Sequence, residues 1–213
     1  MSHTIDTVVV SPLDVNCYIF GCEDHKTCAV IDPGDSAARI MEKVEARGYK
    51  LAMIINTHAH ADHTGANAKL KSASGALIHI HEADAPILVH PSMSDMSVYL
   101  GIEPSPPADV LLKDGDMLKV CPCAELTVIH TPGHSPGGIC LLSGKTLFTG
   151  DTLFRFSVGR SDLPGGDGKT LIKSITEKLF PLPDDVTAYP GHGESSTIGD
   201  EKKYNPFLVG AFR

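Results

Sequence analysis

The chain has 213 residues, of which 42% are hydrophobic and 21% are charged, so its composition excludes a disordered or fibrous protein. Its 18 basic and 26 acidic residues give a formal net charge of −8, which argues against binding to nucleic acid or to an anionic membrane surface. This length lies within the range of one large domain, and we predict a single domain over residues 1–213.

The first half of the chain predicts a strand meander followed by alternating helices and strands. Apolar runs separated by turn residues predict strands at 7–10, 15–20 and 27–31. Helical spacing predicts a helix over 36–47, with Asp35 or Ser36 as N-cap and Gly48 as the stop. The later elements are a strand at 51–56, a helix at 66–74, a strand at 76–80, a helix at 82–89 and a surface excursion at 91–107.

The second half begins again with strands and ends with helices. The expected elements are strands at 109–112, 117–120, 126–130, 138–142 and 146–149, a glycine-rich loop at 157–168, a helix at 169–179, a strand at 186–189 and a helical turn at 199–204. Because strands followed by helices occur twice, we predict an α/β fold with two sheets packed face to face. Helices would cover both outer faces, which makes a four-layer αββα sandwich with one sheet from each half.

A cluster of potential metal ligands directly follows the predicted strand 51–56, in the run Thr57-His58-Ala59-His60-Ala61-Asp62-His63. Alternate side chains of an extended segment share a side. We therefore expect His58 and His60 to hold one ion, while Asp62 and His63 point apart and serve a second. Neither the helical His pair at i and i+4 nor a cysteine-based zinc motif matches this run.

Three further candidate ligands, His134, Asp151 and His192, each follow a predicted strand and lie beside glycine. Glycine lets the backbone approach an ion closely, and loops at strand ends are where a rigid sheet presents a site. His79 and His81 share one side of a strand, where contact with a metal-binding side chain or with solvent is expected rather than metal binding itself. The other histidines are interpreted as structural: His3, His25, His90 and His130.

The cysteines are interpreted as free thiols, because no secretory signal precedes this long chain. They are Cys17, Cys22, Cys28, Cys121, Cys123 and Cys140. The pair Cys121-Pro122-Cys123 lacks the CxxC spacing and is interpreted as chance rather than as a redox or metal motif. No apolar stretch approaches the about 18 residues of a membrane-spanning helix. We expect a cytoplasmic location and no membrane partner.

Four motifs, in their order along the chain, resemble those of the metallo-β-lactamase superfamily, and most closely those of its glyoxalase II branch. They are the run 57–63, Thr131-Pro132-Gly133-His134, Gly150-Asp151-Thr152-Leu153-Phe154 and Tyr189-Pro190-Gly191-His192-Gly193. The segments 157–166 and 204–208 resemble those of short bacterial hydroxyacylglutathione hydrolases. The resemblance covers nearly the whole chain and implies the metallo-β-lactamase fold and a thioesterase activity.

The resemblance also implies a role for each candidate residue. His58, His60 and His134 would bind the first metal, Asp62, His63 and His192 the second, and Asp151 would bridge them. Three imidazoles suit zinc, whereas the second site, with its extra carboxylate, could also accept iron or manganese. Arg160 would bind a glutathione carboxylate, although a surface arginine is the alternative. Lys202 and Lys203 could reach the site or form a solvated helix face.

Two ions about 3.5–4 Å apart lower the pKa of a shared water toward about 7. The resulting hydroxide, held through Asp62 and Asp151, is expected to attack a thioester such as S-lactoylglutathione and release a 2-hydroxy acid and glutathione. A thiol of pKa near about 8.5 needs little help in leaving. The expected partner is this small molecule, and the expected state is a monomer or small homo-oligomer.

Three alternatives remain open. A persulfide dioxygenase of the same fold would hold one iron through His58, His134 and Asp151. A non-enzymatic zinc module would saturate the metal with protein ligands, whereas this donor set needs water to complete it. A β-lactamase or nuclease is favoured less. Longer glyoxalase II proteins carry a C-terminal helical domain and this chain ends at Arg213, which leaves the substrate open.

Overall fold

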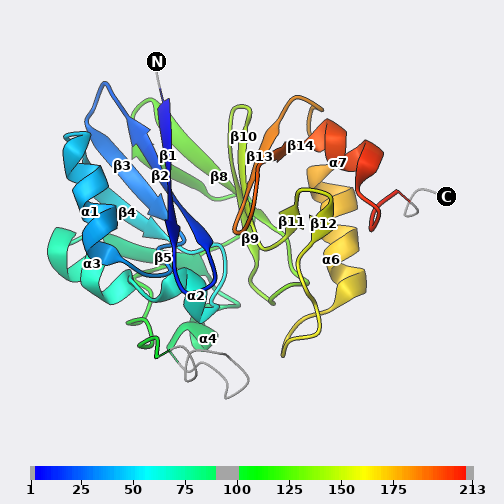
Figure 1. Ribbon diagram of the computed structural model, residues 1–213, viewed down its shortest axis with the longest axis horizontal. Helices are drawn as coiled ribbons and strands as arrows, with labels where there is room; N and C mark the ends of the chain where they lie inside the picture. The colour runs from blue at the N-terminus through cyan, green and yellow to red at the C-terminus, as the bar shows by residue number, and fades with distance from the viewer. Residues whose placement is uncertain (1–2, 90–100, 210–213) are drawn as a thin grey trace.

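The two halves of the chain form two sheets that face one another (Figure 1). The computed structural model describes residues 3–89 and 101–209, and within them each half forms one six-stranded sheet. The first sheet has the order β1 (His3–Val10), β2 (Val15–Cys22), β3 (Thr27–Ile31), β4 (Lys50–Ile55), β5 (Leu77–His81), β6 (Val110–Leu112). The second has the order β14 (Ser196–Thr197), β13 (Thr187–Pro190), β10 (Thr146–Gly150), β9 (Ile139–Ser143), β8 (Ala124–His130), β7 (Met117–Cys121). Within the described residues, the chain crosses from the first sheet to the second only once, through the turn 113–116 that joins β6 to β7.

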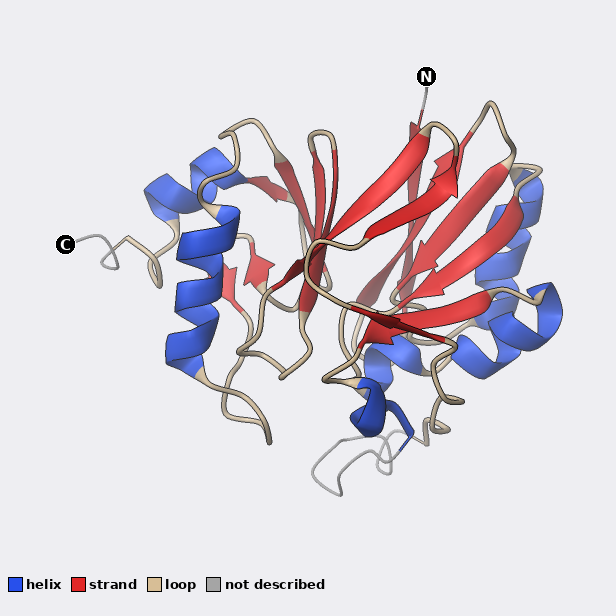
Figure 2. Ribbon diagram, turned by 180° about the vertical axis from the view of Figure 1, so that it is seen from behind, coloured by secondary structure: helices blue, strands red, loops and turns tan. Residues whose placement is uncertain are grey.

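Helices cover the outer face of each sheet (Figure 2). The first sheet carries α1 (Ala37–Ala46) and α3 (Asn67–Ser74). The second sheet carries α6 (Gly168–Ser174), which continues into the π-helical segment η1 (Ile175–Leu179), and α7 (Ile198–Tyr204). The predicted four-layer αββα sandwich is therefore confirmed. None of the helices in the described residues is long and apolar enough to cross a membrane.

Three apolar clusters separate these layers. The central cluster lies between the sheets and includes Phe20, Ile55, Leu126 and Phe148. Two outer clusters lie beneath the helices, where α1 buries Ile40 and Val44, and where α6 and η1 bury Leu171 and Ile175. Strand β2 is buried along all eight of its residues, because it is covered on both faces. The strand is therefore a rigid element, and it holds the loops at both of its ends in place.

Several predicted boundaries differ from the structure. Strand β1 begins at His3 rather than at residue 7, and the helix expected over 82–89 is the shorter α4 (Ala85–Val89). The expected loop 157–168 opens with β12 (Ser157–Val158), which pairs with β11 (Leu153–Phe154) in a small ribbon. Residues 91–100 of the predicted excursion, together with His90, lie outside the described residues.

Candidate metal centre

The seven predicted ligands come together at one end of the two sheets. His58 and His60 lie in the loop after β4, and Asp62 and His63 lie in the short helix α2 (Ala61–Thr64). From the second half, His134 follows β8, Asp151 follows β10 and His192 follows β13. Their donor atoms form three groups: His58, His60 and His134; Asp62, His63 and His192; and His58, His63 and Asp151.

The local conformation of the His58–His63 run differs from the extended segment that was predicted. His60 is extended and caps α2, so Asp62 and His63 lie on a helical turn. Their side chains do not point apart, because Asp62 Oδ2 lies 3.5 Å from His63 Nε2. Gly34 permits this turn, since a Cβ there would lie 1.6 Å from the carbonyl oxygen of Asp62. The turn brings onto one side two ligands that a strand would have separated.

The first group holds three imidazole nitrogens at short range. His134 Nε2 lies 2.9 Å from His60 Nδ1 and 3.3 Å from His58 Nε2. Burial, together with the neighbouring histidines, lowers the pKa of His58 well below its usual value and that of His60 to about 3. Both rings are therefore neutral, which is the form that binds metal.

Hydrogen bonds behind two of these rings direct their free nitrogens toward the group. His134 Nδ1 donates to the carbonyl of Arg160 at 2.7 Å, which leaves Nε2 with its lone pair. The Thr57 hydroxyl donates to Asp32 Oδ2 at 2.6 Å, so its oxygen can accept from His58 Nδ1 at 3.1 Å. His58 Nε2 is then also a lone-pair donor.

The second group combines imidazoles with a carboxylate. Asp62 Oδ2 lies 3.5 Å from both His63 Nε2 and His192 Nε2. His192 Nδ1 donates to the carbonyl of Leu13 at 3.0 Å, and His63 Nδ1 lies 3.1 Å from Asp32 Oδ2, so each Nε2 faces Asp62. Desolvation opposes protonation of His63, yet the carboxylates of Asp151, Asp62 and Asp32 raise its pKa to about 10. The carboxylates thus favour a positive charge at this position, which a metal ion would supply in place of the proton.

Asp151 lies between the two groups. Its Oδ1 is 3.4 Å from His63 Nε2, and its Oδ2 is 3.6 Å from both His134 Nε2 and His192 Nε2. Gly191 lets this carboxylate fit, since a Cβ there would lie 2.2 Å from Asp151 Oδ1. One carboxylate therefore faces donors from both groups.

Three buried atoms have no hydrogen-bond partner in the described residues: His63 Nδ1, which lies beside Asp32, and two atoms that face the donor groups, His63 Nε2 and Asp151 Oδ1. Leaving such an atom unsatisfied costs about 1–3 kcal/mol, so native proteins rarely tolerate it. Two divalent cations would satisfy the two atoms that face the donor groups and would find the nitrogen and oxygen donors that zinc and iron accept. The residues present therefore fit a pair of metal ions.

Contacts across the sheets hold the loop that carries His192. Asn16, on β2, is not one of the candidate ligands. Its backbone N–H donates to Gly191 O at 2.7 Å, and its side-chain amide donates to Pro190 O at 3.0 Å. The Tyr18 hydroxyl also donates to Pro190 O, at 2.7 Å. The buried strand β2 thus fixes the position of His192.

Two buried carboxylates that support the centre were not predicted from the sequence. Asp84 is fully buried and accepts hydrogen bonds from Ala59 N at 2.9 Å, Ser135 Oγ at 2.8 Å and Gly137 N at 2.5 Å. Asp32 accepts from both the N–H and the hydroxyl of Thr57. Asp32 follows β3 in Asp32-Pro33-Gly34, which was a usable signal, whereas Asp84 has no such context.

A cavity of about 620 Å³ opens beside the donor groups. Leu13, Ile87, Phe154 and Val158 give it an apolar wall, and Arg160 also lines it. The Arg160 side chain is more than half exposed and binds Asp162 through two hydrogen bonds of 2.8 and 2.9 Å. Within the described residues, the lining of the cavity thus combines donor atoms of the centre, apolar surface and the cationic side chain of Arg160.

The remaining predicted candidates lie elsewhere. Lys202 pairs with Asp184 on the surface, Lys203 lies over the ring of Tyr204, and neither is among the residues that line the cavity. His79 Nδ1 lies 2.9 Å from the carbonyl of Leu77, and His81 stacks on His130 with ring centroids 3.9 Å apart. These histidines are held by contacts outside the donor groups.

Comparison with known proteins gives matches along most of the chain. A family model described as the metallo-beta-lactamase superfamily matches residues 10–192. The hydroxyacylglutathione hydrolase GloC of Haemophilus influenzae is 38% identical over 213 residues, which cover 96% of this chain and 97% of that protein. Two solved structures are similar. The BLEG-1 B3 metallo-beta-lactamase has a TM-score of 0.90 and 34% identity over 97% of this chain and all of that one. TTHA1623 in a di-iron-bound form has a TM-score of 0.86 and 36% identity over 95% of this chain and all of that one.

Proposed function

Because the chain belongs to the metallo-beta-lactamase superfamily, we propose that it is a metal-dependent hydrolase that cleaves a glutathione thioester such as S-lactoylglutathione. The observation that carries this proposal is the pair of donor groups that face the same carboxylate, Asp151. When bound there, two divalent ions supply an ionised water at neutral pH and an electrophile for a carbonyl oxygen. The products would be a 2-hydroxy acid and glutathione.

In this proposal the protein residues hold and orient the reacting groups. His58, His60 and His134 would hold one ion, Asp62, His63 and His192 would hold the other, and Asp151 would face both. Desolvation works against ionisation of Asp62, but His63 and His192 lower its pKa, so it remains a carboxylate at neutral pH. The departing sulfur leaves as a thiolate, which needs no dedicated acid because thiols ionise near about pH 8.5.

The cavity supports a thioester substrate of moderate size. A volume of about 620 Å³ lies within the about 300–1,000 Å³ of small-molecule pockets. Two dications opposite the carboxylates of Asp62 and Asp151 leave the centre positive, which attracts an anionic substrate. Arg160 lines the cavity and is proposed to bind a substrate carboxylate, in exchange for its contact with Asp162. The likeness to the Haemophilus influenzae hydrolase supports the same substrate class.

Zinc is the proposed metal at the group of three imidazoles, because neutral nitrogen ligands suit it. Iron or manganese is an alternative at the group that contains Asp62, whose carboxylate is a harder ligand. The di-iron form of TTHA1623 supports iron as an alternative.

The direct test is the loss of thioester absorbance from S-D-lactoylglutathione with zinc-loaded protein. A chelator-treated sample is the control, and turnover that returns when zinc is added back supports the proposal. A β-lactam is assayed in parallel, because the similar structure BLEG-1 is named as a metallo-beta-lactamase. β-Lactam turnover without thioester turnover would contradict the proposal.

A mononuclear-iron persulfide dioxygenase is the alternative of another reaction class. Iron-loaded protein would then consume oxygen with glutathione persulfide and form sulfite, while zinc-loaded protein would leave the thioester intact. That pair of results would replace the thioesterase by the dioxygenase.

A further inference from the structure

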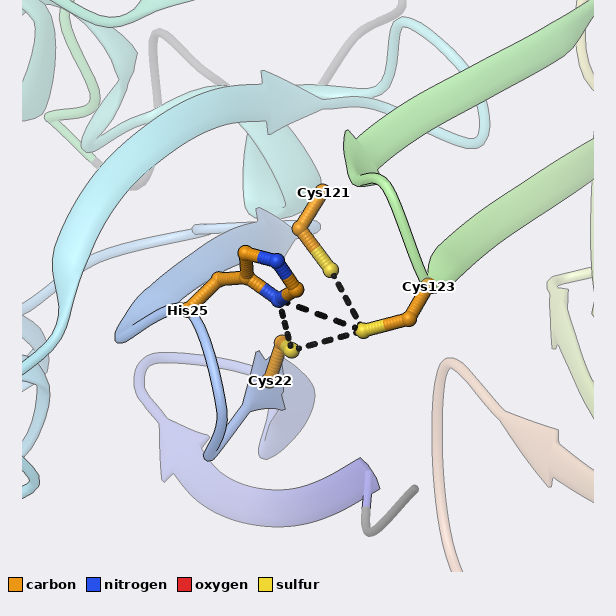
Figure 3. Close-up of side chains that lie close together, drawn as sticks. All are labelled: Cys22, His25, Cys121 and Cys123. Carbon is orange, nitrogen blue, oxygen red and sulfur yellow. Dashed lines mark hydrogen bonds between the residues drawn. The ribbon is translucent and has the colours of Figure 1, made fainter.

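A second cluster of metal-binding side chains lies away from the candidate metal centre (Figure 3). Cys22 ends β2 and His25 lies in the turn between β2 and β3, while Cys121 ends β7 and Cys123 lies in the turn between β7 and β8. One donor atom from each of the four lies within 4.8 Å of all the others. The first two residues come from the first sheet and the last two from the second.

The four donor atoms converge on a common point (Figure 3). Cys123 Sγ lies 3.2 Å from Cys22 Sγ and 3.1 Å from Cys121 Sγ. His25 Nδ1 lies 3.4 Å from Cys22 Sγ and 3.3 Å from Cys123 Sγ. The two sulfur–sulfur separations exceed the about 2.05 Å of a disulfide bond, and all three cysteines of the cluster are free.

The backbone of both hairpins favours this convergence. A register shift between Lys119 and Cys121 lets Cys121 pair with Ala124 across a turn of two residues, which contains Cys123. Such bulges change the direction of a side chain. A hydrogen bond from Thr27 Oγ1 to Val120 O, of 3.3 Å, joins the two hairpins beside the cluster. Two of the four residues thus end strands, and the other two lie in the short turns that follow those strands.

The number and type of donors match a closed zinc site. Three thiolates and one imidazole are a common structural set, and zinc bonds of about 2.3 Å to sulfur place tetrahedral donors a little under 4 Å apart. Cys22 and Cys121 are buried, Cys123 is half-buried and His25 is exposed at the rim. The sulfurs of Cys22 and Cys121 are therefore shielded from water, and the cluster meets solvent at His25.

We propose that Cys22, His25, Cys121 and Cys123 bind one zinc ion, in a structural site that joins an end of one sheet to an end of the other. This proposal replaces our interpretation of Cys121-Pro122-Cys123 as chance and of His25 as merely structural. The sequence signal that could have found the site is Cys-x2-His in one predicted hairpin and Cys-x-Cys in another. Neither half is a sufficient motif, and they lie about 100 positions apart.

The site is too far from the candidate metal centre to serve its chemistry. Val15, at the first position of β2, forms an isolated bridge with His192, whereas Cys22 is the last residue of the same eight-residue strand. Seven steps of about 3.3 Å separate these ends by about 23 Å. With four protein ligands the coordination shell is also closed, so the role that fits is stabilisation.

Cobalt substitution tests the proposal, because only a thiolate ligand gives a sulfur-to-cobalt charge-transfer absorption in the near ultraviolet. The candidate metal centre offers imidazoles and carboxylates alone, so cobalt bound there does not contribute to this band. The full-length protein loaded with cobalt is expected to show the band. Cys121→Ser/Cys123→Ser leaves one thiolate, and we expect it to lose at least two-thirds of the absorption.

Cys28→Ala is the matched control, since Cys28 is a buried thiol on the neighbouring strand β3 and lies outside the cluster. It is expected to keep the full band, and circular dichroism of each variant checks that it is folded. Absence of the band in the cobalt-loaded wild type, or an equal band in the double variant, would overturn the proposal. So would a disulfide between two of the cluster cysteines in the purified protein. None of these readouts depends on thioester turnover.

Discussion

Asp151 is the residue whose carboxylate faces donors of both metal groups. Asp151→Asn keeps the shape of the side chain but removes its charge and one of its oxygen ligands. We expect both ions to be depleted together and turnover to fall by more than about 100-fold, beyond the about 10–100-fold cost of losing a supporting contact. Elemental analysis and the thioester assay on one preparation measure the two effects.

Asp185→Asn is the control for that variant, because it makes the same change on an exposed carboxylate paired with Lys145. Normal metal content and turnover in Asp151→Asn would contradict a shared ligand.

Arg160 is proposed to exchange a carboxylate of its own chain for one of the substrate. Arg160→Ala is expected to raise the KM of a carboxylated thioester about five- to tenfold, in line with about 1 kcal/mol for an exposed ion pair. An uncharged thioester should change by less than about twofold. Asp162→Asn releases the guanidinium from its bidentate contact and is expected not to raise either KM. Equal effects of Arg160→Ala on both substrates would remove Arg160 from substrate binding.

The candidate ligands could be predicted because they are histidines and aspartates, which have few other roles at the end of a strand. His134, Asp151 and His192 all follow strands and lie beside glycine, and the structure brings them together. Asp84 could not be predicted, since its role depends on three hydrogen bonds from segments that are distant in the sequence. The predicted orientations of Asp62 and His63 were wrong because a four-residue helix is too short to show helical periodicity in the sequence.

At the scale of elements, Asp84 joins the loop after β4 to the loop after β8. Its carboxylate accepts from Ala59, Ser135 and Gly137, and an amide offers only one oxygen for these three donors. Asp84→Asn is therefore expected to weaken metal binding by about 10–100-fold and to lower the free energy of unfolding by about 1–3 kcal/mol. Chelator competition and urea unfolding measure these quantities.

Ser135→Ala removes one of the three donors and serves as the graded comparison. It should reduce metal affinity less than Asp84→Asn does. An Asp84→Asn protein that binds metal as tightly as the wild type would show that the loops are positioned without this carboxylate.

Asp6 on β1 links the first sheet to Arg47 at the end of α1. The hydrogen bond from Arg47 lowers the pKa of Asp6, so the carboxylate stabilises the fold at a pH above its unfolded value of about 3.8. This contribution is lost as the pH falls from there through the lower folded pKa. Asp6→Asn should lose about 0.5 kcal/mol at pH 7, and its difference from wild type should shrink as the pH is lowered below 3.8.

Urea unfolding at pH 7 and at a pH below 3.8 measures this difference, with Glu42→Gln on the exposed face of α1 as the control. A deficit of the same size at both pH values would show that the ion pair does not cause it.

Elements with many residues could be predicted better than short ones. The helix α1 and strands β2 to β4 have long apolar patterns that periodicity reveals. The paired strands β11 and β12 have two residues each, and β14 has two, which is too few for any alternation. Their pairing depends on neighbours in space.

At the scale of the whole molecule, the candidate metal centre joins the halves of the chain, because each half supplies some of its donors. Each ion that binds only the folded state stabilises it by about 2.7 kcal/mol at 100 times its Kd. For a chain of this length, chelation should lower the Tm by roughly 5–10 °C for each ion removed, and readdition of zinc should restore it.

This measurement is best made in the Cys121→Ser/Cys123→Ser background, so that the second cluster does not contribute. Adding Asp151→Asn to it should remove most of the zinc-dependent shift. A Tm that does not respond to chelator in the Cys121→Ser/Cys123→Ser protein would contradict metal binding across the halves.

The αββα layering could be predicted because strand and helix patterns occur twice in order. The meeting of Cys22 and His25 with Cys121 and Cys123 could not, since it depends on how the two sheets are aligned. No local pattern carries that alignment.

The single passage of the chain between its sheets, at the turn 113–116, makes this fold a candidate for a split reporter. A break between Asp114 and Gly115 would leave each complete sheet on a separate polypeptide. Four of the seven predicted ligands would belong to one fragment and three to the other. Metal would therefore favour reassembly of the fragments, and regained metal binding would report that two fused proteins had come together.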